Sequence, residues 1–260
     1  MQIELFGCTS AGKSTLANSI LEVCREQGMD ALMIMSDDFV LKQARLDWIK
    51  TSFARTLLMD LFLLFVCLAT WQSNLEFSAF AIQIIFRLPI TWLEKLNLAR
   101  NVLKRIGTFE IIHNRGPEQQ IVLVDGGTLQ AAHHLFVHTF VQTNDSDLST
   151  FVRLAPLPTM AIYITQNESV LVKRTIKRGH KRIPDRSDEK VKIFIKQAVN
   201  TFDKLVQQLV LEAKLSVVDS QRNVFVAQGY QSDPLLAKAL EIIRAEIDAA
   251  IVNNSTQNCA

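Results

Sequence analysis

The pattern that most constrains this chain lies between Gly7 and Ser14, where the sequence reads GCTSAGKS. A short apolar stretch at residues 2–6 precedes it, and a helical pattern begins near Lys13. Two glycines at this spacing let the backbone wrap around an anion with its N–H groups pointing inward, and the start of the following helix adds positive potential. The full match to G-x-x-x-x-G-K-[ST] between a strand and a helix predicts a loop that binds nucleotide phosphates.

Two side chains of this loop and one distant carboxylate have expected roles. The Lys13 ammonium would contact the β- and γ-phosphates, and the Ser14 hydroxyl would ligate Mg²⁺. Asp125 ends the apolar stretch IVLV and precedes two glycines, as a carboxylate that holds the same metal would. Capping of the next helix is the alternative for Asp125. We therefore expect ATP and Mg²⁺ as cofactors. The loop residues expected around the nucleotide are Gly7, Cys8, Thr9, Ser10, Ala11, Gly12, Lys13, Ser14 and Thr15.

Apolar stretches of strand length alternate with helical patterns along the chain. Strands are expected at residues 2–6, 31–35, 121–124, 160–164 and 215–218, and a closing helix at 232–251. Continuous apolar strands separated by helices are typical of a parallel sheet with helices on both faces. We therefore predict an α/β fold, a doubly wound five-stranded parallel sheet, in a single domain over residues 1–252, followed by a disordered tail at 253–260.

Composition excludes several classes of protein. The formal net charge of +2 over 260 residues provides no field that would favour nucleic acid as a partner. The four cysteines show no C-x-x-C and no metal-ligand spacing, and the N-terminal sequence MQIELFG lacks the features of a signal peptide, so we expect a cytoplasmic protein. The apolar run at 56–71 contains Asp60 and is shorter than the roughly 20 residues that a bilayer requires. We expect a buried helix there and no integral membrane segment; contact with a membrane or an oily acceptor is the alternative.

Four places in the chain together resemble the nucleoside and nucleotide kinases, in particular their uridine-kinase-like and thymidylate-kinase-like members. They are the loop at 7–14, Ser36-Asp-Asp-Phe39, Val124-Asp-Gly-Gly127 and the stretch at 162–182. The GTPase signals are absent, because TQNE and DGGT stand where N-K-x-D and D-x-x-G would be. The resemblance implies transfer of the γ-phosphoryl group of ATP to a small molecule, with a helical acceptor-binding region at about 41–106.

The resemblance also implies an arginine lid at about 174–189, because such kinases close an R-x-x-x-R-G segment over the phosphates. Arg174 and Arg178 match that segment, and Arg182 follows shortly after it. Guanidinium groups there would stabilise the charge of the transferred group and exclude water. By this match Arg178 and Arg182 are catalytic, and Arg174 contacts the nucleotide. A solvated basic loop is the alternative.

Asp37 and Asp38 carry the question of the acceptor. They follow the apolar stretch ALMIM and should emerge at the carboxyl edge of the sheet, where ligands of α/β proteins bind. A kinase acting on an alcohol needs a carboxylate near the hydroxyl group, and the resemblance assigns that role to Asp37, although the residues alone leave the choice between the two open. Helix capping by both is the alternative.

The acceptor itself is expected to be a small molecule. Thymidylate kinases carry Asp-Arg at the position of the Asp pair and this chain does not, which favours a neutral hydroxyl acceptor over a nucleotide. A nucleoside monophosphate kinase is the alternative within the class, and a regulatory ATPase without an acceptor is the alternative outside it. No nucleic acid is expected as a partner, and a homodimer is left open.

Overall fold

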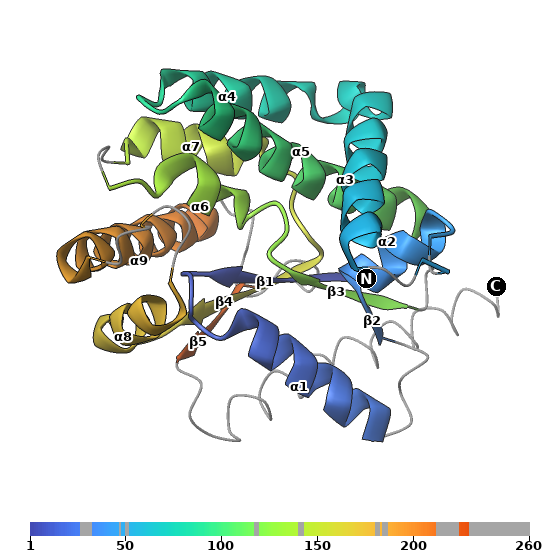
Figure 1. Cartoon of the computed structure of the whole chain (residues 1–260), viewed down its shortest axis with the longest axis horizontal. Helices are drawn as coiled ribbons and strands as arrows, with labels where there is room; N and C mark the ends of the chain where they lie inside the picture. The colour runs from blue at the N-terminus through green and yellow to red at the C-terminus, as the bar shows by residue number, and fades with distance from the viewer. Residues whose placement is uncertain are drawn as a thin grey trace.

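A parallel β-sheet forms the centre of the protein (Figure 1). The computed structural model describes residues 1–26, 33–46, 48–49, 52–116, 120–139, 143–179, 183, 187–211 and 224–228. The strand order is β2-β3-β1-β4-β5, and every neighbouring pair is parallel. The strands are β1 (Gln2–Gly7), β2 (Met33–Met35), β3 (Ile121–Asp125), β4 (Met160–Thr165) and β5 (Val224–Gln228). The predicted α/β fold with a parallel sheet is confirmed.

Helices cover the sheet on both of its faces. Figure 1 shows α1 on one face and the group α3 to α5 over the other. Long apolar strands that are buried on both faces require such cover, and the side chains of β1 are buried along its whole length. The helices are α1 (Lys13–Glu26), α2 (Ser36–Gln43), α3 (Ser52–Ala69), the 3₁₀ turn η1 (Trp71–Asn74), α4 (Leu75–Arg87), α5 (Trp92–Arg115), α6 (Ala131–Phe136), α7 (Asp145–Leu154), α8 (Glu168–Arg178) and α9 (Asp188–Leu211).

The helices between β2 and β3 extend further than the expected region of 41–106. The first of them, α2, begins directly after the strand, because Met35 is still extended and Ser36 is already helical. After the break that includes Pro89, α5 restarts with a capping box in which Thr91 and Glu94 satisfy each other's backbone N–H groups. This helix then continues to Arg115, where its carboxyl end reaches β3.

Aromatic side chains pack α9 onto the sheet. Phe6 of β1 and Tyr163 of β4 have ring centroids 5.3 Å apart, and both rings lie near Phe202 of α9, at 6.1 and 6.2 Å. Phe6 and Phe202 are fully buried. Burial of rings of this size contributes a large share of core stability, so α9 is firmly attached beside β1 and β4.

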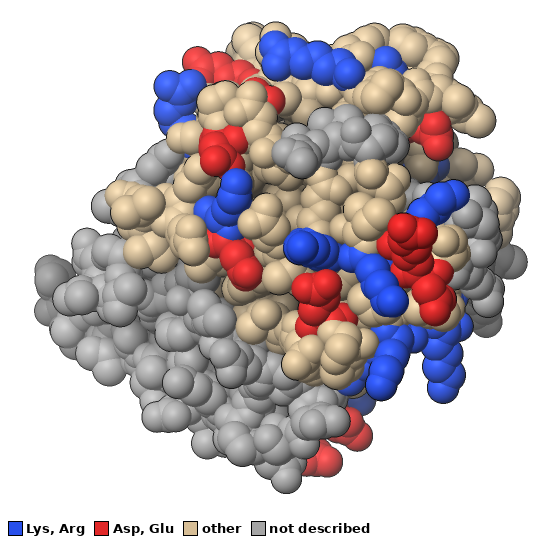
Figure 2. All heavy atoms as spheres, turned by 90° about the vertical axis from the view of Figure 1, so that its left-hand side faces the viewer, with Lys and Arg blue, Asp and Glu red and all other residues tan. Residues whose placement is uncertain are grey.

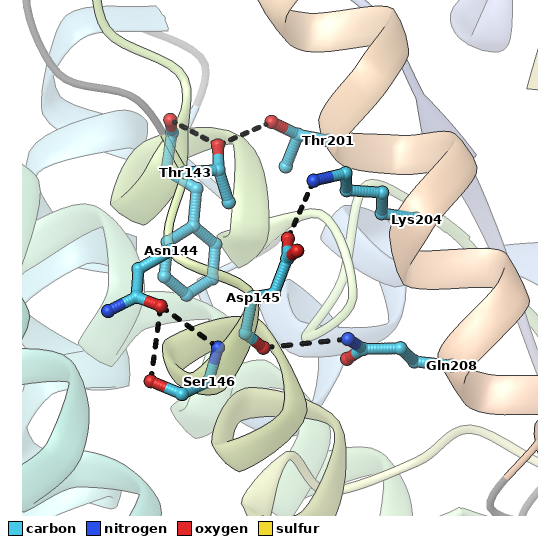
Figure 3. Close-up of polar contacts among 8 residues, drawn as sticks. Thr143, Asn144, Asp145, Ser146, Thr201, Lys204 and Gln208 are labelled. Carbon is cyan, nitrogen blue, oxygen red and sulfur yellow. Dashed lines mark hydrogen bonds and ion pairs between the residues drawn. The ribbon is translucent and has the colours of Figure 1, made fainter.

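Polar contacts hold α9 to the start of α7 (Figure 3). Lys204 Nζ lies 2.6 Å from Asp145 Oδ1, and the hydroxyl groups of Thr143 and Thr201 are 2.9 Å apart. Asn144 caps α7 by accepting a hydrogen bond from the backbone N–H of Ser146 at 3.0 Å. The start of α9, at the end of the predicted lid, therefore belongs to a helix that is fixed at several points.

The remaining predictions about the chain's end lie outside the described residues. They are the strand at 215–218, the helix at 232–251 and the tail at 253–260. The fifth strand that the structure describes is β5, Val224–Gln228, which pairs with β4 on the side opposite β1. Within the part of the chain that is described, no single helix has the length and apolar character to cross a membrane. One pair, Phe53–Ala69 with Gln72–Arg87, meets the criterion jointly but is bent by 81°.

Candidate active site

The loop between β1 and α1 has the backbone geometry of an anion cradle. Gly7 and Gly12 have φ angles of 142° and 101°, and Ser10 also has a positive φ of 63°. A Cβ atom at Gly7 would lie 2.4 Å from the carbonyl oxygen of Ile164 in β4, so the loop can approach the sheet this closely only with glycine. The loop runs directly into α1, which begins at Lys13 as predicted.

Lys13 is folded over this loop. Its Nζ atom donates hydrogen bonds to the carbonyl oxygens of Gly7 and Cys8, at 3.0 and 2.8 Å. Burial lowers the pKa of Lys13 to about 8, and the carboxylate of Asp125 opposes that shift. A bound triphosphate would add negative charge beside the ammonium and favour its charged form. Lys13 is therefore already positioned at the place where phosphate oxygens would bind.

The other loop residues divide into a buried and an exposed group. Cys8 and Ala11 are buried beneath the loop, whereas Ser14 and Thr15 are exposed at the start of α1. Burial raises the pKa of the Cys8 thiol to about 12, which keeps it protonated. Thr9 and Ser10 are half-buried at the tip. The side chains that can reach a metal ion thus come from the exposed group.

Ser14 and Asp125 meet at the carboxyl ends of two adjacent strands. The register of β1 and β3 pairs Leu5 with Asp125, so the carboxylate ends beside the loop that leaves β1. The Ser14 hydroxyl donates to Asp125 Oδ2 at 2.5 Å. A hydroxyl and a carboxylate oxygen are hard donors of the kind that Mg²⁺ uses together with water and phosphate oxygens. The two residues predicted to hold the metal therefore fit it.

The start of α2 separates the two aspartates that sequence could not distinguish. Both lie in its first turn, where successive side chains point in different directions around the helix axis. Asp38 Oδ1 accepts a 2.8 Å ion-paired hydrogen bond from Arg55 of α3 and is exposed. Asp37 is also exposed, but its carboxyl group lines a cavity together with Asp125, and partial desolvation there raises its pKa. Of the two aspartates, Asp37 is the one that shares a cavity with Asp125.

This cavity lies between α2, α3, α5 and the end of β3, and has a volume of about 200 Å³. It is mostly polar: the charged and hydrogen-bonding side chains that line it include Asp37, Asn101, Lys104, Arg105, Thr108 and Asp125. Asn101, Arg105 and Thr108 are spaced at i, i+4 and i+7 on α5, so one face of that helix is turned towards the cavity. A polar helix face that borders a cavity is suited to binding a polar ligand.

Arg105 is the functional candidate that sequence reasoning missed. Its Nη1 atom donates to the carbonyl oxygen of Gly127 at 3.1 Å, and Nη2 lies 3.3 Å from Nε2 of His134. Burial lowers its pKa, while the carboxyl groups of Glu4 and Asp125 oppose the change. The signal that could have found it is the spacing of Asn101, Arg105 and Thr108, which places three polar side chains on one face of this helix.

A second missed residue, Glu4, lies fully buried in the central strand. Its carboxyl group accepts hydrogen bonds from the backbone N–H groups of Gln130 and Leu129, at 2.9 and 3.3 Å. Burial raises the pKa of Glu4 to about 7, and these hydrogen bonds limit the rise. A Cβ atom at Gly127 would lie 2.6 Å from Glu4 Oε2, so the turn after Asp125 can approach the strand this closely only with glycine.

Gln130 links the turn after Asp125 to the loop at residues 7–14. Its side-chain oxygen accepts a hydrogen bond from the backbone N–H of Gly7 at 2.9 Å. The turn, held from below by Glu4, therefore supports the first residue of the loop. No local pattern in the sequence indicates this connection, because the two ends are 123 residues apart.

The predicted lid begins on a helix. Arg174 and Arg178 lie in α8, which starts at a cap formed by Asn167 and continues through Arg178, and Asp188 already belongs to α9. The segment predicted as a lid, 174–189, therefore begins within α8 and ends within α9. Arg174 Nη1 donates to the carbonyl oxygen of Ser10 at 3.4 Å.

Arg178 acts electrostatically on Lys13. Its positive charge is among those that lower the pKa of Lys13, although burial of Lys13 is the larger cause. The side chain of Arg178 is exposed at the end of α8. Arg182 lies outside the described residues, so its predicted catalytic role stays a prediction.

Comparison with known proteins gives a likeness of fold only. No family model matches the chain, and no curated protein matches it. Among solved structures, shikimate kinase from Bacteroides thetaiotaomicron matches with 13% identity and a TM-score of 0.42, over 95% of this chain and 98% of that chain. Two structures of deoxyadenosine kinase from M. mycoides, one with bound dCTP and one with the products dCMP and dCDP, match with 13% and 14% identity and TM-scores of 0.44 and 0.46, each over 96% of this chain and 100% of that chain. With TM-scores below 0.5, the function must be inferred from the chemistry of the site.

Proposed function

We propose that this chain is an ATP-dependent kinase that transfers the γ-phosphoryl group to a hydroxyl group of a small molecule. The observation that carries the proposal is the shared cavity of Asp37 and Asp125, which opens beside the loop at residues 7–14. A carboxylate with a raised pKa and a candidate metal ligand thus line one polar space. Phosphoryl transfer to an alcohol needs this combination of a proton acceptor and an anion site.

The proposed reaction gives each of these side chains a role. The loop and Lys13 bind the β- and γ-phosphates of ATP, and Arg178, at the end of α8, stabilises the charge of the transferred group; the resemblance assigns the same role to Arg182. Mg²⁺, held by Ser14 and Asp125, would neutralise phosphate charge. Asp37 accepts the proton of the acceptor's hydroxyl group while the oxygen of that hydroxyl group forms a bond to the γ-phosphorus. The bond from that phosphorus to the β–γ bridging oxygen breaks, and ADP leaves with the bonding electrons.

The cavity also favours a polar acceptor over an oily one. The apolar run of α3 contributes only Met59 and Leu63 to the lining, and polar groups of α2, α5 and β3 make up most of the rest. Apolar side chains such as Leu61 and Phe65 point outward and are more than half exposed. Nucleosides and sugars therefore fit the proposal better than prenols. A nucleoside monophosphate is the second candidate, because Lys104 and Arg105 bring positive charge to the same cavity.

The test is an acceptor screen that follows ADP release from ATP and Mg²⁺. The full chain would be assayed with nucleosides, sugars, nucleoside monophosphates and prenols, and with no acceptor. We expect release to depend on a neutral hydroxyl compound and its phosphate ester to appear in equal amount. Equal release without any acceptor would instead support an ATPase. The buried free thiols Cys8, Cys24 and Cys67 are compatible with the cytoplasmic location that we propose.

A further inference from the structure

Helix α3 presents a row of large apolar side chains to the outside of the molecule. We call Phe53, Leu57, Leu61, Phe65 and Leu68 the α3 ridge; their exposed fractions are 81, 49, 56, 67 and 63%. Successive members are four, four, four and three residues apart, so they follow one side of the helix. The opposite side of α3 is packed against α5 and the cavity. The helix is therefore apolar on both sides, and among the described residues only its inner side is packed against other elements.

The charged residues of α3 do not belong to this ridge. The helix carries two of them, Arg55 and Asp60. Arg55 is paired with Asp38 at 2.8 Å, and Asp60 is paired with Lys104 and, at 3.7 Å, with Arg100 of α5. A helix that lies on a membrane surface usually has Lys and Arg on its polar face for the anionic headgroups. On α3 the single basic side chain is engaged within the fold, so the ridge lacks that feature.

The ridge is large enough to be an interface. From the exposed fractions of its five side chains, it presents roughly 600 Å² of apolar surface. The largest apolar patch of a typical monomer is about 300–600 Å², and a standard interface takes about 800 Å² from each partner. The ridge alone would supply most of that area. By contrast, Figure 2 shows Lys and Arg interspersed with Asp and Glu on the side of the molecule that is at the left of Figure 1.

We propose that the α3 ridge is the interface of a homodimer, in which the α3 helices of two copies pack against each other about a two-fold axis. An uncharged apolar ridge is complementary to itself, which a two-fold interface requires. Side chains at i, i+4 and i+8 form a ridge that packs between the same ridges of a second helix. A charged or strongly polar partner would find no complementary group on it.

This proposal is independent of the proposed kinase activity, but it has a consequence for the site. The inner side of α3 contributes Met59 and Leu63 to the cavity, and Asp60 is buried between α3 and α5. A second copy packed on the outer side would hold α3 against α5. The wall of the cavity would then be fixed from both sides.

The first experiment measures the mass of the full chain in solution by sedimentation over a dilution series. We expect a dimer for the wild type and a monomer for the double variant Leu61→Gln/Phe65→Gln. The far-UV circular dichroism spectrum of the variant should match that of the wild type, which would show that the monomer is folded. The matched control is Ile193→Gln on α9, whose side chain is 47% exposed and which lies on the opposite side of the molecule in Figure 1. The control should remain a dimer.

A second variant tests the geometry without removing the ridge. Leu61 lies at the middle of the α3 ridge, so it meets its own copy across the axis if two α3 helices pair antiparallel. Leu61→Cys should form an inter-chain disulfide under mild oxidation, at a yield well above that of the wild type treated in the same way. The same test at Ile193→Cys should give no more cross-linking than the wild type.

Three outcomes would overturn the proposal. A monomeric wild type would mean that the ridge is covered by the chain itself or left bare. A double variant that is still dimeric would place the interface elsewhere. Flotation of the wild-type chain, but not of the double variant, with phosphatidylcholine–phosphatidylserine vesicles would assign the ridge to a membrane surface instead.

Discussion

The Ser14 hydroxyl lies 2.5 Å from Asp125 Oδ2, although the two residues are 111 positions apart in the chain. They meet because β1 and β3 are adjacent parallel strands whose carboxyl ends lie at the same edge of the sheet. The pair forms a candidate magnesium site beside Lys13. This relationship joins the local loop motif to the cavity that contains Asp37, and it makes the following predictions specific.

Lys13→Ala should lower turnover by about 10²–10³-fold, because one preorganised charge at the transferring group is worth that much. The fold should be unchanged, since the ammonium contacts only carbonyl oxygens of its own loop. Steady-state kinetics of ADP release, together with a thermal unfolding curve, would check both statements. Near-normal turnover in this variant would mean that Lys13 takes no part in catalysis.

Asp37→Asn should lower turnover by about 10²–10⁴-fold and leave ATP binding largely intact, because the amide cannot accept the acceptor's proton. Asp38→Asn is the matched control: its carboxylate pairs with an exposed arginine, and exposed pairs contribute only about 0.2–1 kcal/mol. Since burial raises the pKa of Asp37, wild-type turnover should rise with pH through a value above the usual range of an aspartate. A larger loss at Asp38 would reverse the assignment.

Arg178→Ala should reduce kcat more than it raises the KM for ATP, because this exposed side chain would engage the phosphate mainly in the transition state. Arg174→Ala should instead weaken nucleotide binding, since Arg174 contacts the carbonyl oxygen of Ser10 and supports the loop. Measuring both constants for both variants distinguishes the roles. Identical profiles would show that the two arginines act together as simple binding contacts.

Glu4→Gln should remove a pH dependence of stability. The pKa of Glu4 is raised from 4.5 to about 7 on folding, so the folded state binds the proton more tightly. The resulting stabilisation is complete below pH 4.5 and is lost as the pH rises through 7; over that window it amounts to roughly 3 kcal/mol. Urea unfolding at several pH values, for the wild type and the variant, would measure the difference. Parallel curves for the two proteins would contradict it.

Local patterns were sufficient for the loop and for the general form of the sheet. The predicted start of α1 at Lys13 is confirmed, because a glycine loop after an apolar strand leaves few other ways to continue the backbone. The third and fourth strands were located nearly to the residue for a similar reason, since runs such as IVLV and MAIYI are apolar without interruption. Arg174 and Arg178, which the resemblance assigns to a lid, lie on α8, and that helix begins at the Asn167 cap.

What the sequence alone determined is therefore what depends on neighbouring residues: the glycine loop at 7–14, the helix that follows it and the buried strands. What only the tertiary structure decided is which distant groups meet. Because α2 begins at Ser36, Asp37 lines the cavity beside α3 and α5, whereas Asp38 pairs with Arg55 of α3. Arg105 and Glu4 gained their partners from a turn more than 20 residues further along the chain. The outward side of α3 was likewise undetermined, because a helix that is apolar all round contains no local signal for which side the core will cover.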